Sequence, residues 1–149
     1  MKKLLTAIVM TIAATSSAMA FTANGYWETN AYAATADGYP AANTTVFSWF
    51  DNTIGYQEIA VKFEHSDRCI GRPNGYNLGP TNAVMNGKFV RMVGECYDQS
   101  SYFTGDQSYD RDEWLRVTAR ARTVDMTFPN GFKVIYNANG FQRAVNWRW

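Results

Sequence analysis

The stretch VDMTFPNGFKVIYNA, residues 124–138, decides the fold class of this chain. It contains two short runs rich in β-branched and aromatic residues, separated by Pro129-Asn130-Gly131. Asparagine followed by glycine tolerates the positive φ angles that a tight turn between antiparallel strands requires. The stretch therefore predicts a β-hairpin, and related patterns occur earlier in the chain.

The segment 55–65 alternates between two kinds of side chain, as a strand with one buried and one solvated face does. The first face carries Gln57, Ile59, Val61 and Phe63, and the second carries Tyr56, Glu58, Lys62 and Glu64. The segment 44–50 is apolar on both faces, which predicts a central strand. Asn86-Gly87 predicts a tight turn that leads into a strand over 88–98.

Two polar segments interrupted by glycine are expected to be loops. The first, 66–81, contains Pro73, Gly75, Gly79 and Pro80, and the second covers 100–110. After a turn at Asn139-Gly140, the segment 141–149 alternates again and predicts a final strand.

One helix is expected near 111–122. Asp110 is a suitable N-cap, and Glu113 follows three residues later, as in a capping box. Trp114, Val117, Thr118 and Ala121 share one helical face. A strand over 114–124 is the competing interpretation, because Leu115, Val117, Ala119 and Ala121 also alternate. These patterns predict a single compact α+β domain, with an antiparallel sheet of six or seven strands, one helix and one disulfide.

Residues 1–20 have the pattern of a cleaved secretory signal peptide. Lys2 and Lys3 precede a short apolar run, and Ala18-Met19-Ala20 supplies small residues at a cleavage site. Residues 21–149 would then form a single exported domain, periplasmic or extracellular. Cys69 and Cys96 would be exposed to an oxidising compartment, which predicts a disulfide between them.

The charge balance gives no reason to expect nucleic acid as a partner. The leader holds two of the 14 basic residues and none of the 13 acidic ones, so the exported part is close to neutral. No pattern in the sequence points to a cofactor.

Two candidate sites carry reactive or metal-binding groups, and each has a simpler structural explanation. His65 is the one histidine and lies beside Glu64, Ser66 and Asp67, which suggests a hydrolase. Neighbouring residues of a strand point to opposite faces, however, which disfavours a triad. Asp106, Asp110 and Asp112 form a weak candidate metal cluster that lacks the spacing of a calcium loop, and acids also suit the start of a helix.

Aromatic residues make up 15% of the chain, more than one small core needs. The candidates for a binding surface are Trp27, Tyr97, Tyr102 and Tyr109, because large rigid side chains add contact area at low entropic cost. Heavy use of aromatic residues in a thin β core is the alternative.

The last nine residues resemble the C-terminal strand signal of outer-membrane β-barrel proteins. Phe141, Val145, Trp147 and Trp149 match the signal, whereas Arg143 departs from it because it would face lipid. The resemblance implies membrane contact and an outer-membrane location.

The sequence thus favours an exported, non-enzymatic binding or inhibitor-type module. Its expected partner is a protein or glycan of the cell envelope or outside the cell, contacted through aromatic loop residues. A small outer-membrane barrel and a hydrolase around His65 are the alternatives.

Overall fold

The computed structural model describes residues 21–23, 25–41 and 43–145. Residues 1–20, where a signal peptide is expected, and the residues Trp147 and Trp149 lie outside these ranges. In chain order the elements are β1 (Phe21–Ala23), β2 (Tyr26–Ala34), β3 (Thr44–Asp51), β4 (Tyr56–Phe63), β5 (Tyr76–Met85), β6 (Lys88–Tyr97), β7 (Ser100–Gly105), α2 (Ser108–Arg120), β8 (Thr123–Thr127), β9 (Lys133–Asn137) and α3 (Phe141–Val145).

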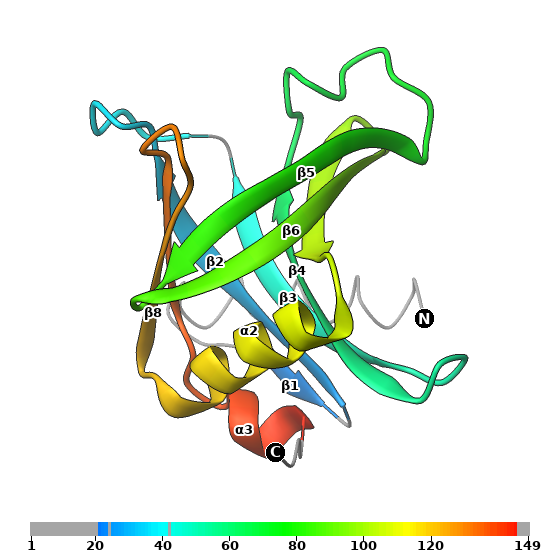
Figure 1. Cartoon of the computed structure of the whole chain (residues 1–149), viewed down its shortest axis with the longest axis vertical. Coiled ribbons are helices and arrows are strands. Elements are labelled where there is room, and N and C mark those ends of the chain that lie inside the picture. Colours follow the sequence, from blue (N-terminus) through cyan, green and yellow to red (C-terminus); the bar gives the residue numbers. More distant parts are fainter. Residues whose placement is uncertain (1–20, 24, 42, 146–149) are drawn as a thin grey trace.

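The antiparallel sheet closes on itself as an eight-stranded barrel (Figure 1). The strands follow one another around it as β2-β3-β4-β7-β6-β5-β8-β9, and β9 pairs back onto β2 through Ala31 to Ala34. The short strand β1 pairs beside β2, outside this ring. A barrel of eight strands has an interior just wide enough to be filled by side chains or to hold one small ligand.

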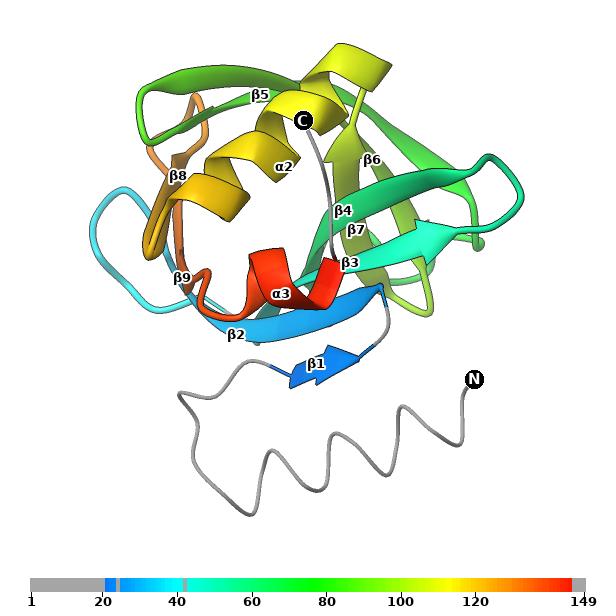
Figure 2. The ribbon, with the colours of Figure 1, turned by 90° about the horizontal axis from the view of Figure 1, so that it is seen from below.

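Helices α2 and α3 cover one end of the barrel (Figure 2). Helix α2 packs against β4, β6, β7 and β8, whereas α3 packs against β1, β2 and β3. Their apolar side chains Trp114, Leu115 and Phe141 are fully buried. Among the described residues, no helix covers the opposite end.

The barrel interior explains why one aromatic candidate is not at the surface. Trp27 is fully buried on β2, its ring lies 5.2 Å from that of Phe141, and its Nε1 donates to the Asn139 carbonyl oxygen. The expectation that Trp27 belongs to a binding surface is therefore wrong. Its side chain fills the core against helix α3.

The predicted fold class is confirmed, and so are the hairpin of β8 and β9 and the strand β4. The hairpin turn differs from the expected one, in which both Asn130 and Gly131 would accommodate positive φ angles. Only Gly131 has a positive φ there, and the Phe128 carbonyl accepts from the Gly131 N–H at 2.9 Å. Pro129 takes the second position of that turn and Asn130 the third, so glycine alone needs the left-handed conformation.

Two segments expected to be loops are partly strands. Residues 76–81 belong to β5, where a bulge between Asn77 and Gly79 accommodates the glycine-rich sequence and the pairing with β6 continues. Residues 100–105 form β7, which follows β6 through a turn at Asp98-Gln99. Both turn residues have positive φ although neither is glycine, so the sequence lacks the usual signal for this hairpin. The strand count therefore exceeds six or seven.

The helix near 111–122 exists, but it begins earlier than expected. It covers 108–120, and Gln107 is its N-cap. Asp110 lies inside the first turn, where its carboxylate accepts from the backbone N–H groups of Gln107 (3.1 Å) and Arg91 (3.0 Å). This buried carboxylate therefore joins the start of the helix to β6.

The expected final strand is wrong for 141–145, which form helix α3. Phe141 and Val145 are buried on this helix, as its packing against the end of the barrel requires. The strand that the outer-membrane resemblance implies is not formed by these residues. No helix within the described ranges is long and apolar enough to span a membrane.

Gly94 gives a test of the packing inside the barrel. A Cβ atom at this position would lie 2.5 Å from Cε1 of the Phe103 ring, directly across on β7. We expect Gly94→Ala to lower the free energy of unfolding by about 1 kcal/mol, because the ring must move toward the open end. Urea unfolding measures this change. Gly38→Ala, at an exposed position, meets no atom within 4 Å and is strained only by its positive φ, whereas Gly94 has no positive φ, so its cost reports the ring contact. Equal stability of Gly94→Ala and the parent protein would contradict the packing described.

Candidate functional site

A pocket of about 560 Å³ occupies the end of the barrel opposite the helices. We call it the mouth pocket. It lies where β5 separates from the β8–β9 hairpin, because β5 pairs with β8 only at Val84 and Met85. Its volume falls within the range of about 300 to 1,000 Å³ that is usual for small-molecule sites. The lining consists of Ala41, Phe63, Glu64, His65, Ser66, Asp67, Arg68, Thr81, Ser101, Phe103, Phe128, Pro129, Asn130 and Phe132.

Four phenylalanine rings form the apolar part of the mouth pocket. Phe63 is central: its ring lies 5.5 Å from Phe132, 5.9 Å from Phe103 and 6.3 Å from Phe128, each pair meeting edge to face. Phe103 is buried and the other three rings are half-buried. Phenyl surface thus remains uncovered in a concave site, which favours an apolar ligand.

The position of each ring follows from strand alternation. Phe63 lies on the inner face of β4 after Ile59 and Val61, and Phe103 is on the inner face of β7 across from Gly94. Phe128 and Phe132 flank the turn between β8 and β9 and extend the inner faces of those strands. The backbone N–H of Phe128 donates to the Phe132 carbonyl at 2.9 Å, which holds the two rings together at the turn.

Polar side chains from the loop between β4 and β5 form the rim. The Glu64 carboxylate accepts weak contacts from Lys62 Nζ and Asn43 Nδ2, both at 3.5 Å. The Arg68 guanidinium donates to the Leu78 carbonyl oxygen at 3.4 Å and so bridges the loop to β5. The rim therefore combines both charges with an apolar floor.

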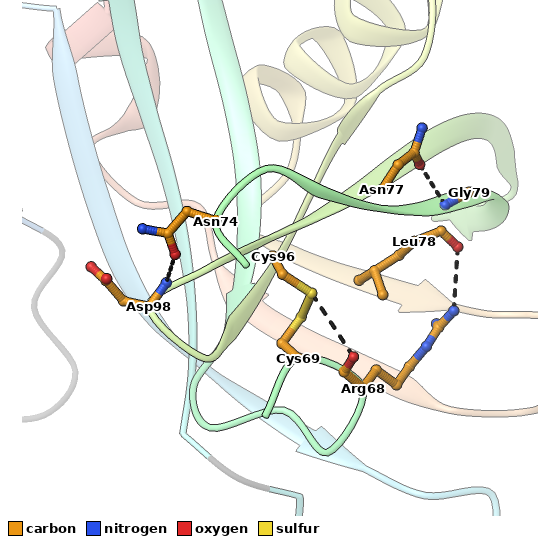
Figure 3. Close-up of a disulfide and its surroundings, with 8 residues drawn as sticks. All are labelled: Arg68, Cys69, Asn74, Asn77, Leu78, Gly79, Cys96 and Asp98. Carbon is orange, nitrogen blue, oxygen red and sulfur yellow. Dashed lines mark hydrogen bonds between the residues drawn. A yellow bond between two sulfur atoms is a disulfide. The ribbon is translucent and has the colours of Figure 1, made fainter. Parts of the chain in front are cut away.

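The predicted disulfide between Cys69 and Cys96 is confirmed, and it attaches the rim to the barrel (Figure 3). Both cysteines are buried, and Cys96 lies on β6. The Gly75 N–H donates to the Cys96 carbonyl at 2.7 Å, and the Asp98 N–H donates to Asn74 Oδ1 at 2.8 Å. The loop is thus fixed at two places on the β6–β7 hairpin. A disulfide of this kind indicates an oxidising compartment outside the cytoplasm.

His65 lies on the rim of the mouth pocket, in the turn that follows β4. It is exposed and has a positive φ of 47°. Glu64, Ser66 and Asp67 line the same pocket, but none of them forms a hydrogen bond with His65 in the part of the chain that the structure describes. The geometry brings the four residues to one rim without the paired arrangement that a hydrolytic triad uses.

Two of the three aspartates of the weak metal candidate serve other contacts, and the third, Asp106, is exposed. Asp110 accepts two backbone N–H groups, as described above, and the Asp112 carboxylate lies 3.3 Å from Arg111 Nε. Over residues 21–23, 25–41 and 43–145, no group of three or more His, Cys, Asp or Glu side chains is arranged to hold a metal ion.

The three candidate tyrosines lie at two different places. Tyr97 and Tyr102 are neighbours on the outer face of β6 and β7, with ring centroids 6.1 Å apart. Tyr109 lies on α2, is 61% exposed and faces a shallow groove beside Phe89. The structure therefore brings together two of the four aromatic residues proposed from the sequence.

Sequence reasoning missed the phenylalanines of the mouth pocket. Phe63 was assigned to the buried face of its strand, and Phe128 and Phe132 flank a recognised turn, so their inward direction could be predicted. Their convergence could not, because it depends on the closure of the barrel. Comparison of the chain with protein-family models, curated proteins and solved structures finds no match.

Proposed function

We propose that this chain is a non-enzymatic binding protein that takes a small apolar molecule into the mouth pocket. The observation that carries the proposal is the convergence of four phenylalanine rings, three of them half-buried, in a hollow of about 560 Å³. The rings contribute binding area, and the rim residues His65, Ser66 and Asp67 lack the paired arrangement of a hydrolytic triad, which favours binding over reaction.

The ligand class follows from the lining. Rings that meet edge to face present both faces and edges, and they suit a flat aromatic or compact aliphatic body. The rim groups Asp67, Arg68 and Asn130 would contact the more polar end of such a ligand. Since the disulfide indicates an oxidising compartment, we propose that the protein meets this ligand after export directed by residues 1–20.

The experiment is a fluorescence titration with N-phenyl-1-naphthylamine, a neutral apolar probe. Thr81 lines the mouth pocket from β5, so Thr81→Trp fills the hollow without removing any phenylalanine. We expect this variant to bind the probe at least about tenfold more weakly than the parent protein, a difference of about 1.4 kcal/mol.

The matched control is Asn82→Trp, which places the same side chain on the exposed face of the same strand. It should bind the probe as the parent protein does. Unsaturable probe binding, or equal affinities of the two tryptophan variants, would contradict the proposal.

A further inference from the structure

A second surface, on the outside of the barrel, carries four aromatic rings in a continuous row. We call it the aromatic row: Trp49 and Phe47 on β3, Tyr102 on β7 and Tyr97 on β6. Successive ring centroids are 5.3 Å, 6.1 Å and 6.1 Å apart. The outer face of a barrel strand normally carries polar side chains, so a row of rings across several strands is a candidate contact surface.

A glutamate lies directly across from three of these rings on the neighbouring strand. Phe47 pairs with Glu28, Trp49 with Glu58, and Tyr102 with Glu95. Side chains paired in this way share one face of the sheet and are near neighbours. Each pair places a carboxylate near an aromatic ring, and both groups attract a cation. Glu28 already accepts from the Tyr26 hydroxyl and Glu58 already pairs with Arg111, so Glu95 is the glutamate that remains.

The chain already uses this arrangement for one of its own cations. The Arg111 guanidinium lies over the Tyr56 ring, 4.6 Å from its centroid, while Nη1 contacts Glu58 Oε1 at 3.3 Å. Burial raises the pKa of Glu58, an effect that the Arg111 charge partly offsets.

A second internal cation repeats the pattern within the row itself. Lys62 Nζ lies 5.8 Å from the centroid of the Tyr102 ring and 3.5 Å from Glu64 Oε1. Two cations from different elements thus take the same position, over a ring and beside a glutamate.

At the Glu95 end of the row, Lys62 lies over the Tyr102 ring, whereas no cation of the described residues lies over the Tyr97 ring. Glu95 forms no ion pair with any residue of the described ranges. Tyr97 lies two residues further along the same face of β6 and is 44% exposed. Glu95 and Tyr97 therefore form a site that is open to a positively charged group, beside the ring of Tyr102 that Lys62 already contacts.

We propose that the aromatic row binds an extended, arginine-bearing segment of a partner protein, with one guanidinium over Tyr97 and beside Glu95. Arginine fits best because its planar guanidinium stacks on a ring and pairs with a carboxylate at once. The carboxylates favour a cationic partner over an anionic one, and the row runs across strands as an extended segment would. The aromatic row is separate from the mouth pocket, so a negative result for one proposal does not contradict the other.

The test is isothermal titration calorimetry with a short peptide that alternates glycine and arginine. Peptides that alternate glycine with glutamate or with serine, and a β-1,4-linked N-acetylglucosamine oligomer, are the comparison ligands. We expect only the arginine peptide to bind, with an affinity that falls as the salt concentration rises. Glu95→Gln should weaken this binding about threefold to fivefold, and Tyr97→Ala at least threefold.

Two matched controls should bind the arginine peptide normally. They are Asp106→Asn, an exposed carboxylate beside α2, and Tyr39→Ala, an exposed ring in the loop between β2 and β3. An unchanged circular dichroism spectrum and urea unfolding midpoint show that each variant is folded. Equal binding of the arginine and serine peptides, no effect of Glu95→Gln, or binding of the sugar oligomer in place of the arginine peptide overturns the proposal.

Discussion

Replacing Cys69 and Cys96 together by alanine is expected to lower the free energy of unfolding by about 3 to 4 kcal/mol. The cysteines are 27 residues apart, and the cross-link restricts the unfolded chain over that distance. The segment between them includes the polar loop at 66–75, which buries little besides Cys69 and depends on its attachment to β6. Urea unfolding of the variant and the parent protein measures the loss.

The same double variant is expected to bind N-phenyl-1-naphthylamine several-fold more weakly. Ser66, Asp67 and Arg68 line the mouth pocket immediately before Cys69, so the disulfide holds them in place. Ile70→Ala, an exposed position in the same loop, is the control and should change neither quantity. A double variant with the stability and probe affinity of the parent protein would show that the disulfide does not organise the rim.

Tyr136→Phe is expected to lower the free energy of unfolding by about 1 to 3 kcal/mol near pH 8. The Tyr136 hydroxyl accepts from Trp114 Nε1 at 3.0 Å and shares a hydrogen bond with Thr118 Oγ1 at 2.8 Å, all inside the barrel. Its loss leaves the buried Trp114 N–H without this acceptor. These contacts join helix α2 to β9.

The difference in the free energy of unfolding between Tyr136→Phe and the parent protein should become smaller at high pH. Burial raises the pKa of Tyr136 to about 12, against an ordinary value of 10, although its two hydrogen bonds act in the opposite direction. Because the folded-state pKa is the higher one, the hydroxyl stabilises the fold fully below pH 10. That contribution is lost as the pH rises from 10 toward 12, and it amounts to about 2 to 3 kcal/mol.

Urea unfolding followed by circular dichroism, at intervals from pH 8 to pH 11.5, measures the difference between Tyr136→Phe and the parent protein. Tyr39→Phe, at an exposed tyrosine, should show no difference at any pH. A deficit of Tyr136→Phe that stays constant over the whole range would mean that the Tyr136 hydroxyl is not shielded from water.

Sequence patterns within a few neighbouring residues predicted several strands and turns correctly. The alternation of β4 and the two runs around Pro129-Asn130-Gly131 state which residues pair and which face is buried. The disulfide was predicted because Cys69 and Cys96 are the two cysteines of the chain and because the pattern of residues 1–20 led us to expect export. Each of these inferences needs only the pattern of neighbouring residues or the number of cysteines in the chain.

Elements whose formation depends on distant partners were missed. The turn at Asp98-Gln99 has positive φ without glycine, and the pairing of β7 with β4 and β6 stabilises it. Helix α3 has a sequence that alternates as a strand does, yet it folds as a helix because Phe141 packs on Trp27 at the end of the barrel. Neither outcome is contained in the local residue pattern.

The sites divide in the same way. Strand alternation places Phe63 inside the barrel, but only the pairing of β9 with β2 brings Phe132 beside it. Trp27 has the composition of a surface aromatic and lies in the core, since a barrel closed by helices needs large side chains at that end. The aromatic row likewise depends on the register between β3, β4 and β7.

The most direct measurement of the central claim is a set of nuclear Overhauser effects between bound N-phenyl-1-naphthylamine and the protein. The account predicts cross-peaks from the naphthyl protons to the ring protons of Phe63, Phe128 and Phe132, with none to Tyr97 or Tyr109. Cross-peaks to the outer tyrosines, together with the absence of cross-peaks to the three phenylalanine rings, would contradict the assignment of the mouth pocket as the ligand site.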